Sequence, residues 1–360
     1  MATRTAPQGT EVTGGVDTHK DSHTAAAVDA AGRRLGSAAF PASTQGYRAL
    51  LNWLHSFGRL VQVGIEGTGS YGAGLSRFLR KADVAVVEVS CPSRALRRKQ
   101  GKSDPVDAEA AARAALAGEA LGVPKTQDGP VEIIRMMRLQ RRSAIKAKSQ
   151  AANQIHAVVS TAPEELRAAL RDLSLKALIA LASQFKVPAP TDVHSASKYV
   201  LRGLAGRWKH LENEIAALDK QLATLVRRTA PALVALRGVG TDVAGTLLVA
   251  AGDNPGRLHR ESSFAALCGV SPLDASSGRQ RRHRLNRGGN RDANRALWVI
   301  ALVRMRCDPR TRAYVARRTG EGLGKSEILR CLKRYIAREV FKTLQGGTTT
   351  RVKAVTACAA

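Results

Sequence analysis

EVTGGVDTHKDSHTAAAVDAAGRRLGSAAF, residues 11–40, is the stretch from which the architecture of the chain is first apparent. The apolar run at 11–17 predicts a strand that ends in Asp17. The residues at 23–40 predict a β-hairpin that turns at 30–33. We therefore expect the N-terminal part to begin with one strand followed by a hairpin.

Helical and strand patterns alternate after this stretch. Apolar residues recur at helical spacing in 44–57, and the run 61–66 predicts a strand that ends in Glu66. Three further elements are expected: a helix at 71–82, a buried strand at 82–90 and an Ala-rich helix at 106–120. The order strand, hairpin, helix, strand, helix, strand, helix is that of a ribonuclease H-like domain, although it also suits other α/β folds loosely.

Strand signals stop after residue 124. Long amphipathic helices are expected at 129–160 and 191–230, separated by a Val-Pro-Ala-Pro break at 187–190. The spacing within 210–226 suits a helical hairpin or coiled-coil arm, and equally a plain bundle helix. The predicted fold class is α/β plus all-α, with four regions: a catalytic domain at 10–125, a helical linker domain at 126–230, a C-terminal helical domain at 231–345 and a disordered tail at 346–360.

The composition is strongly basic. The 360 residues include 57 Lys and Arg against 29 Asp and Glu, a formal net charge of +28. Polyanions offset a charge of this size, so nucleic acid is the expected partner. The basic residues cluster at 93–104, at 135–150 and again near the C-terminus, which favours nucleic-acid binding over compositional bias.

Several classes of protein are excluded. The longest uncharged apolar runs, 243–252 and 297–303, fall far short of the roughly 20 residues that a membrane-spanning helix needs. The first residues lack the apolar core of a secretory signal. The five cysteines show neither CxxC nor Cys/His spacing, which argues against a zinc site or a disulfide framework and for a reducing compartment, the cytoplasm.

Acidic residues are scarce, so their positions are informative. Asp17 and Glu66 each close an apolar strand, where a carboxylate is a poor choice. Asp104 and Asp107 lie three residues apart at a helix start and so share one face. Two strand-end carboxylates and a helical pair suit a two-metal phosphoryl-transfer site, because hard oxygen ligands hold Mg²⁺. An alternative interpretation makes Asp104 a helix N-cap with Asp107 as its capping-box partner.

The C-terminal part has three features that favour nucleic-acid chemistry. LRGVGTDVAGTLLVAAGD (236–253) resembles a helix-hairpin-helix, in which backbone amides meet a phosphate, although an ordinary glycine turn fits equally well. Residues 279–318 contain 13 Arg against two Asp. Ser276, Ser277 and Gly278 form a loop just before this run, and a serine among guanidinium groups could attack a phosphodiester. Such a loop, taken alone, is more often only a loop.

Five ordered segments together resemble the DEDD-type insertion-sequence transposases, which pair a RuvC-like domain with a C-terminal serine domain. The segments are GVDTHK (15–20), GIEGTGSYG (64–72), KSDPVDAEAAARAA (102–115), LRGVGTDVAGTLL (236–248) and CGVSPLDASSGRQRRHRLNRGGNRDANRALW (268–298). The resemblance covers residues 12–344. Pro105 replaces a more usual basic or polar residue, and RGGN (287–290) matches the family's Lys/Arg-x-Gly-Asn run only loosely.

The resemblance implies roles for particular residues and partners. Asp17, Glu66, Asp104 and Asp107 match the metal-binding quartet, which would hold two Mg²⁺ ions. Ser277 matches the serine that attacks DNA, with the adjacent Ser276 as an alternative. The implied activity is cutting and rejoining of double-stranded DNA through a phosphoserine, guided by a structured RNA from the element. A homo-oligomer, dimer or tetramer, acting in the bacterial cytoplasm at the nucleoid is implied as well.

The side chains and glycines expected to contact nucleic acid come from the basic clusters, the Gly-x-Gly turn and the Arg-rich segment: Arg97, Arg98, Lys99, Arg141, Arg142, Gly238, Gly240, Arg279, Arg281, Arg282, Arg284, Arg287, Asn290 and Arg291. Two other functions stay open. One is a metal-dependent nuclease of the Holliday-junction type, in which water attacks and the serine is idle. The other is a non-catalytic nucleic-acid-binding protein whose carboxylates are helix caps.

Overall fold

The computed structural model describes residues 10–89, 103–118, 122–187, 189–278 and 283–357. The chain divides into two compact units. The first comprises residues 1–128 with 252–259, and the second comprises 129–251 with 260–360. The predicted division into three domains stays a prediction.

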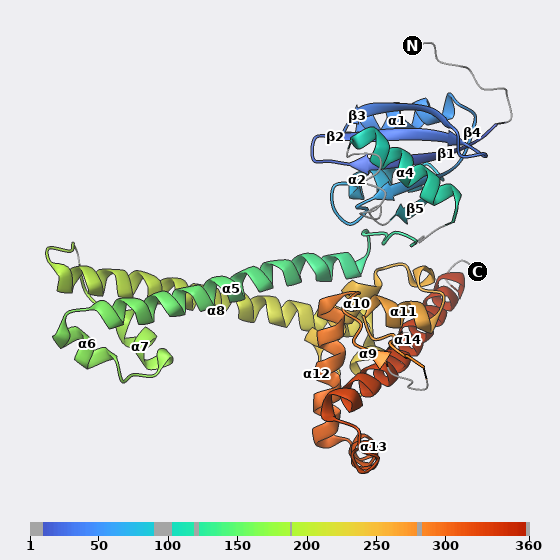
Figure 1. Ribbon diagram of the computed structural model, residues 1–360. Coiled ribbons are helices and arrows are strands. Elements are labelled where there is room, and N and C mark those ends of the chain that lie inside the picture. The colour runs from blue at the N-terminus through green and yellow to red at the C-terminus, as the bar shows by residue number, and fades with distance from the viewer. Residues whose placement is uncertain (1–9, 90–102, 119–121, 188, 279–282, 358–360) are drawn as a thin grey trace. The chain divides into compact units, whose positions relative to one another are not determined.

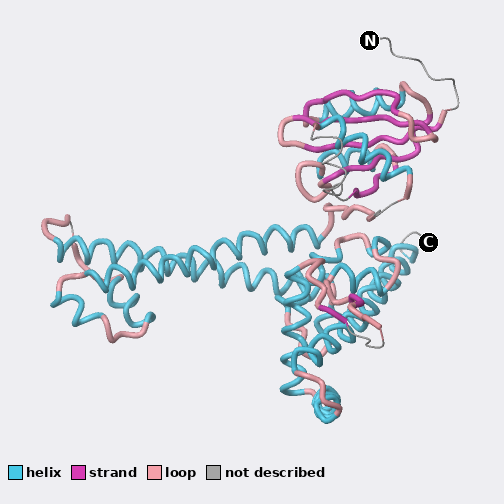
Figure 2. Tube along the Cα trace, in the orientation of Figure 1, coloured by secondary structure: helices cyan, strands magenta, loops and turns pink. Residues whose placement is uncertain are grey.

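The first unit contains a five-stranded mixed sheet with the strand order β3-β2-β1-β4-β5 (Figures 1 and 2). Strands β1, β2 and β3 are antiparallel neighbours, whereas β4 and β5 run parallel to β1. The strands are β1 (Glu11–Thr18), β2 (Ser22–Asp29), β3 (Arg34–Pro41), β4 (Arg59–Glu66) and β5 (Ala85–Val89). The strand and hairpin predicted for residues 11–40 are confirmed.

Helices cover both faces of this sheet. They are α1 (Thr44–His55), α2 (Ala73–Lys81) and α4 (Asp104–Leu116). Two adjacent glycines identify the faces: a Cβ added to Gly14 would meet Leu54 of α1, whereas one added to Gly15 would collide with the backbone of α4. Val16 and Ile65 pack with α1 and α2 in the main core of the unit. Helix α4 lies against the opposite face.

The predicted element boundaries in this unit shift by a few residues at turns. The helix expected at 71–82 begins at Ala73, because residues 67–72 form a glycine-containing turn. The strand expected at 82–90 begins at Ala85, after Asp83 adopts a positive φ of 57° that ends the helix. Helix α4 begins at Asp104, two residues before the predicted start, and ends at Leu116.

Two long helices dominate the first half of the second unit. Helix α5 (Pro130–Thr161) and helix α8 (Val193–Thr229) pack as an antiparallel pair, with α6 (Glu164–Leu170) and α7 (Leu175–Ala182) at the far end (Figure 1). Ion pairs of Arg141 with Asp219 and of Lys148 with Glu212 cross between the helices. Of the two interpretations of the heptad-like spacing, the helical hairpin is the correct one.

The rest of the second unit is a helical body. Its helices are α9 (Pro231–Val234), α10 (Thr241–Ala251), α11 (Glu261–Leu267), α12 (Arg291–Cys307), α13 (Pro309–Gly320) and α14 (Lys325–Ala357). The residues of its core include Leu247, Phe264, Leu297, Ile300 and Ile336, which are buried. A short 3₁₀ helix, η1 (Pro255–Arg257), belongs to the first unit.

Two features of this body differ from the sequence analysis. Strands β6 (Leu273–Asp274) and β7 (His283–Arg284) pair as a small antiparallel hairpin, although no strand was expected beyond residue 124. Two-residue strands are too short to leave an alternating pattern. Helix α14 continues to Ala357, past the predicted start of the tail at 346, because lengthening an existing helix needs no new nucleation.

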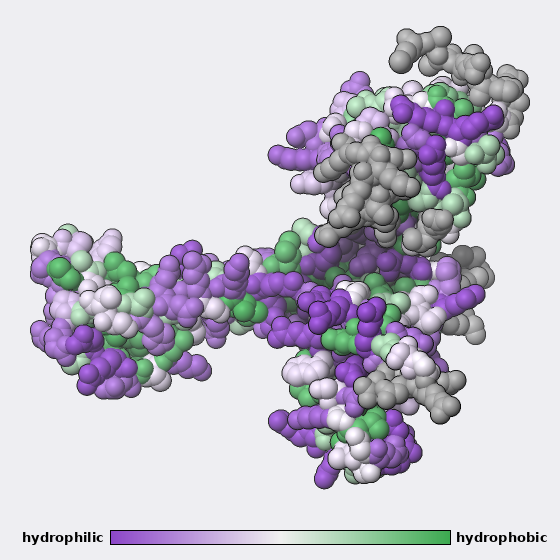
Figure 3. All heavy atoms as spheres, viewed as in Figure 1, coloured by the Kyte–Doolittle hydropathy of each residue, from purple (hydrophilic) through white to green (hydrophobic). Residues whose placement is uncertain are grey.

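Figure 3 shows hydrophilic side chains along much of the α5–α8 pair. None of the helices in the described ranges combines the length and apolar character needed to cross a membrane.

Candidate metal centre and nucleic-acid-binding segments

The ends of β1 and β4 bring two of the predicted carboxylates to one edge of the sheet. The strands are parallel, with Gly15 opposite Gly64 and Val16 opposite Ile65, so the next residues, Asp17 and Glu66, end neighbouring strands. Side chains alternate along a strand, so Asp17 lies on the face of Gly15 and Glu66 on the face of Gly64. Both carboxylates therefore face the side of the sheet that α4 covers.

Helix α4 reaches this edge because two glycines let it lie close to the sheet. A Cβ on Gly15 would lie 2.1 Å from the Ala112 nitrogen, and one on Gly64 would lie 2.7 Å from the Ala111 oxygen. Any larger residue at either position would push the helix backbone away. The first turn of α4, which carries Asp104 and Asp107, extends from this contact toward the ends of β1 and β4.

Asp17, His19 and Asp104 form a group of potential metal ligands. One ligand atom from each side chain lies within 4.8 Å of the others. The Nε2 atom of His19 lies 3.1 Å from Asp17 Oδ2 and 3.5 Å from Asp104 Oδ1. The Asp17 side chain is 13% exposed, whereas the other two are about half exposed. Two carboxylates and one imidazole at an accessible edge suit a divalent cation.

Glu66 and Asp107 share the face but not this group. Asp107 is 5% exposed, while Glu66 is half-buried at the end of β4. The Glu66 backbone oxygen accepts a 2.8 Å hydrogen bond from the Thr18 hydroxyl, which ties the ends of β1 and β4 together. The structure thus places all four predicted carboxylates on one side of the sheet and brings Asp17 and Asp104 together through His19.

The N-cap interpretation of Asp104 is wrong. Ser103 occupies the N-cap position and its backbone oxygen accepts from the amides of Val106 and Asp107, while Asp104 is the first residue of the helix. Pro105 fits this first turn because its fixed φ suits the start of a helix and its missing N–H costs nothing there. The Asp104 carboxylate approaches His19 instead.

His19 was not singled out from the sequence. It follows Asp17 by two residues, so the two side chains leave the extended backbone on the same side. The spacing Asp-x-His at a strand end is the signal that could have identified it. A histidine beside a carboxylate can ligate a metal directly or orient a ligating carboxylate.

The predicted serines lie in the loop between β6 and β7. Ser276 donates hydrogen bonds to the Asp274 Oδ1 atom from its backbone nitrogen, at 2.9 Å, and from its hydroxyl. These bonds from Ser276 hold the pKa of Asp274 below its usual range. Ser277 is exposed and precedes Gly278, whose φ of 57° turns the chain.

The Gly-x-Gly segment forms the turn before α10. Gly238 has a φ of 79°, a conformation that favours glycine, and a Cβ on Gly240 would meet no atom within 4 Å. The helix before this turn, α9, has only four residues. Asp242 in the first turn of α10 lies 2.7 Å from Arg138. The proposed helix-hairpin-helix and its phosphate contact stay predictions.

Two of the predicted basic contacts form ion pairs within the second unit. Arg141 pairs with Asp219 and lies 3.7 Å from Asp242, so it connects α5 to α8 and α10. Arg142 lies 2.6 Å from Asp292 at the start of α12. Six other predicted contacts lie outside the described residues: Arg97, Arg98, Lys99, Arg279, Arg281 and Arg282.

The remaining predicted contacts surround the start of α12. Asn290 is the N-cap of this helix, and its side chain accepts a 2.9 Å hydrogen bond from the Ala293 nitrogen. Arg287 and Arg291 line a cavity of about 320 Å³ with the exposed Trp298. Arg284 lines a separate, larger cavity. Asn290 thus has a structural role as a helix cap, and contact of these residues with nucleic acid stays a prediction.

The chain combines two features: a mixed α/β unit with carboxylates gathered at the ends of parallel strands, and an Arg-rich helical unit. This combination is typical of proteins that act on nucleic acid with the help of metal ions. Comparisons with known proteins make this specific. Residues 14–162 match the IS110-type DEDD transposase family model, described as "Transposase", and residues 230–316 match the model described as "Transposase IS116/IS110/IS902 family".

A curated relative agrees with both models. The chain is 30% identical over 152 residues to the "Insertion element IS110 uncharacterized 43.6 kDa protein" of Streptomyces coelicolor. The match covers 41% of the chain and 37% of the length of that relative. The chain belongs to the IS110 family of DEDD transposases.

Proposed function

We propose that the chain cuts and rejoins double-stranded DNA as the transposase of an insertion sequence, with the first unit as its RuvC-like, ribonuclease H-like catalytic domain. The observation that carries this proposal is the meeting of Asp17, His19 and Asp104 at the ends of parallel strands. The strand order, with three antiparallel strands followed by two parallel ones, supports the ribonuclease H-like assignment.

The carboxylates give this site its chemistry. Asp17 and Asp104 would hold a divalent ion with His19 as a third ligand or as the group that orients them, and Glu66 and Asp107 face the same side for a second ion. Carboxylate oxygens are the ligands that Mg²⁺ prefers. When bound there, Mg²⁺ would neutralise negative charge on the scissile phosphate and on the departing oxygen. The half-exposed position of His19 and Asp104 leaves room for a DNA strand.

Ser277 is the proposed nucleophile. Its Oγ would bond to the scissile phosphorus while the bond from phosphorus to a sugar oxygen breaks, and the hydroxyl proton would pass to that oxygen. The resulting phosphoserine retains the phosphodiester energy that rejoining requires. Ser276, whose hydroxyl donates to Asp274 in a local turn, is the alternative nucleophile, and the family resemblance favours Ser277. Nearby arginines such as Arg284 would stabilise the charge on the phosphate.

DNA and a structured guide RNA are the proposed partners, in a homo-oligomer. The net charge of +28 supports binding of polyanions in general. The identity of the RNA and the number of subunits rest on the family resemblance alone.

The carboxylate site can be tested by an isosteric substitution, assayed with the element-end RNA, donor and target DNA, and Mg²⁺. We expect Asp17→Asn to lower strand cleavage to below about 1% of wild type while DNA affinity stays within about twofold. The matched control is Asp21→Asn, an exposed acid in the β1–β2 turn that lies outside the group of potential ligands. Full cleavage by Asp17→Asn would contradict the assignment of the site.

A further inference from the structure

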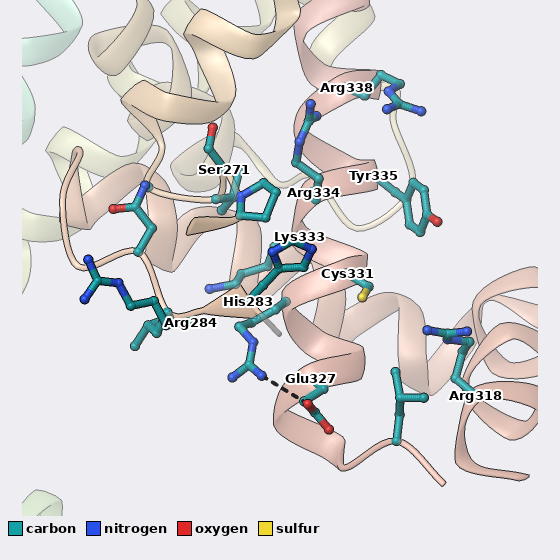
Figure 4. A pocket seen from close by; sticks show the side chains of 17 residues that line it. Ser271, His283, Arg284, Arg318, Glu327, Cys331, Lys333, Arg334, Tyr335 and Arg338 are labelled. Carbon is teal, nitrogen blue, oxygen red and sulfur yellow. Dashed lines mark ion pairs between the residues drawn. The ribbon is translucent and has the colours of Figure 1, made fainter. Parts of the chain in front are cut away.

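A cavity of about 850 Å³ lies in the second unit beside the β6–β7 hairpin (Figure 4). One wall is formed by His283 and Arg284 of β7, another by the loop at 269–272, and a third by one side of α14. The same hairpin carries Ser276 and Ser277 in its loop. The cavity therefore lies next to the segment with the proposed nucleophile, although neither serine lines it.

The wall of this cavity is cationic. Its described residues include six Arg and Lys side chains and one carboxylate, that of Glu327; the cations are Arg284, Arg318, Arg330, Lys333, Arg334 and Arg338. Three acids compensate part of this charge: Glu261 pairs with Arg334 and lies 3.9 Å from Arg338, Glu327 lies 3.6 Å from Arg330, and Glu321 pairs with Arg318. Positive charge remains in excess along the wall, so an anion is the expected ligand.

Lys333 is the clearest case of a positive charge in this wall that no carboxylate of the described residues neutralises. The residue is 8% exposed, and its Nζ donates to the Asn294 side-chain oxygen at 2.9 Å rather than to a carboxylate of the described residues. Burial, with Arg330 nearby, lowers the pKa of Lys333. A buried ammonium with a neutral partner is stabilised when an anion enters its surroundings. The Nε of Arg318 is likewise buried and lacks a hydrogen-bond partner in the described part of the chain.

The same cavity has an aromatic and apolar side. Tyr335 is 52% exposed and packs edge-to-face against Tyr314, with the ring centroids 5.8 Å apart and the planes at 86°. Figure 4 shows Tyr335 close to Arg334 and Arg338 on α14. Val270, Pro272 and Leu285 add apolar surface to the wall. An inorganic phosphate would use the arginines but not this surface, whereas a nucleotide uses both.

We infer that this cavity binds an unpaired nucleotide, with its phosphate among the arginines of α14 and its base on Tyr335. A concave site of this volume falls in the range of about 300–1,000 Å³ typical of small-molecule pockets. It admits an unstacked nucleotide but not a duplex, whose bases are enclosed. That the nucleotide belongs to the strand reacting at Ser277 rests on the proposed function; the binding itself needs neither Ser277 nor the carboxylates.

Base stacking is tested with the full chain and single-stranded oligonucleotides of about 12 residues carrying one 2-aminopurine, one series DNA and one RNA. Wild type is expected to bind the single strand and to quench the 2-aminopurine fluorescence. Tyr335→Ala should weaken single-strand binding about tenfold and abolish the quenching, while affinity for a duplex of equal length changes less than about twofold. Tyr335→Phe should behave as wild type. Tyr199→Ala, which removes a 43%-exposed tyrosine from α8, is the matched control.

The charge contribution is tested by salt dependence. Arg338→Ala should lower the slope of log affinity against log salt for the single strand by about one. Arg48→Ala, which removes an exposed arginine of α1 that lies outside the cavity wall and outside the predicted basic clusters, should leave the slope unchanged. Tighter binding of the DNA or of the RNA series identifies the source of the nucleotide. Ser277→Ala should bind as wild type, so loss of the proposed chemistry and loss of this site are distinguishable.

Two results would overturn the inference. Absence of 2-aminopurine quenching by wild type would show that no base stacks in the cavity, independently of whether any variant folds. Equal weakening of single-strand and duplex binding by Tyr335→Ala would reduce the cavity to a general phosphate contact.

Discussion

His19 adds a potential nitrogen ligand, or a hydrogen-bond donor, to a site in which the sequence pattern shows only carboxylates. Its Nε2 lies between the oxygens of Asp17 and Asp104, so one imidazole contacts groups from β1 and from α4. In either role it holds these two carboxylates in place relative to one another. The residue thus links the strand end to the helix start.

Removal of this imidazole is expected to weaken the site without dismantling it. His19→Gln should reduce affinity for Mg²⁺ or Mn²⁺ by about 10–100-fold, because outer-shell groups and single ligands contribute effects of this size. Titration of the ions by calorimetry measures the change. Metal affinity equal to wild type would show that His19 is a bystander at the edge of the sheet.

Asp29 provides a pH-dependent contribution to the stability of the first unit. Burial alone would raise its pKa, but hydrogen bonds from Arg33 and from the Ala31 amide outweigh burial and lower the pKa. A carboxyl with a lowered folded-state pKa stabilises the fold above its unfolded value of about 3.9, and this stability is lost as the pH falls through the folded-state pKa.

We therefore expect Asp29→Asn to lower the free energy of unfolding by about 1–2 kcal/mol at neutral pH. The difference from wild type should shrink as the pH falls below about 3.9 and should be smallest below the lowered folded-state pKa, where the wild-type carboxyl is protonated in the folded protein as well. Urea unfolding at pH 7 and at about pH 2 measures both values, with Asp21→Asn as the exposed control. A difference that is the same at both pH values would contradict the proposed role of the carboxylate.

Individual site residues can be predicted from the sequence where they interrupt a regular pattern. Asp17 and Glu66 stood out because charged residues end apolar strands, and the structure places both at the predicted sheet edge. His19 did not stand out, because it follows the strand and interrupts no apolar run. The alternative interpretation, in which Asp104 is the N-cap of α4, is wrong because Ser103 holds that position; both residue types are good N-caps, and sequence alone cannot fix the first helical turn.

Helix α4 and strand β1 are the elements that assemble the site, and their separation is set by Gly15. A methyl group there would lie 2.1 Å from the Ala112 nitrogen and 2.3 Å from the Ala108 oxygen, which are backbone atoms and cannot rotate away. Gly14 differs, because its added Cβ would meet only side-chain atoms of Leu54 and Val63, at 3.0–3.3 Å.

We expect Gly15→Ala to destabilise the first unit by about 3 kcal/mol, as overpacking does, and to abolish cleavage by displacing Asp104 from Asp17. Gly14→Ala should cost less than about 1 kcal/mol, since the Leu54 side chain can adjust. Thermal unfolding and the cleavage assay compare the two variants. Equal effects of the two substitutions would mean that close approach of α4 does not build the site.

Long periodic elements were predictable, and short ones were not. Helices α5 and α8 were expected within a few residues of their bounds, because their apolar repeat extends over many turns. The β6–β7 hairpin has only two residues in each strand, which is too few to leave a periodic pattern in the sequence. That hairpin nevertheless carries the serines, so the part of the fold closest to the proposed chemistry was the part least visible in the sequence.

At the scale of the molecule, the acidic residues of the second unit are largely used to fix its arginines. Asp219, Glu261 and Asp292 each pair with an arginine of another element. The chain still has 28 more Lys and Arg than Asp and Glu. This excess of positive charge is available to phosphates, as the proposed binding of nucleic acid requires.

The proposed chemistry requires the carboxylates of the first unit and Ser277 of the second to act on the same DNA strand. The most direct measurement is recovery of an SDS-resistant protein–DNA adduct from a reaction of the full chain with element-end RNA, donor and target DNA, and Mg²⁺. We expect the adduct with wild type and with Ser276→Ala, and its absence with Ser277→Ala and with Asp17→Asn. Cleavage by Ser277→Ala at the wild-type rate, with no adduct from any variant, would contradict the account and indicate a nuclease that uses water.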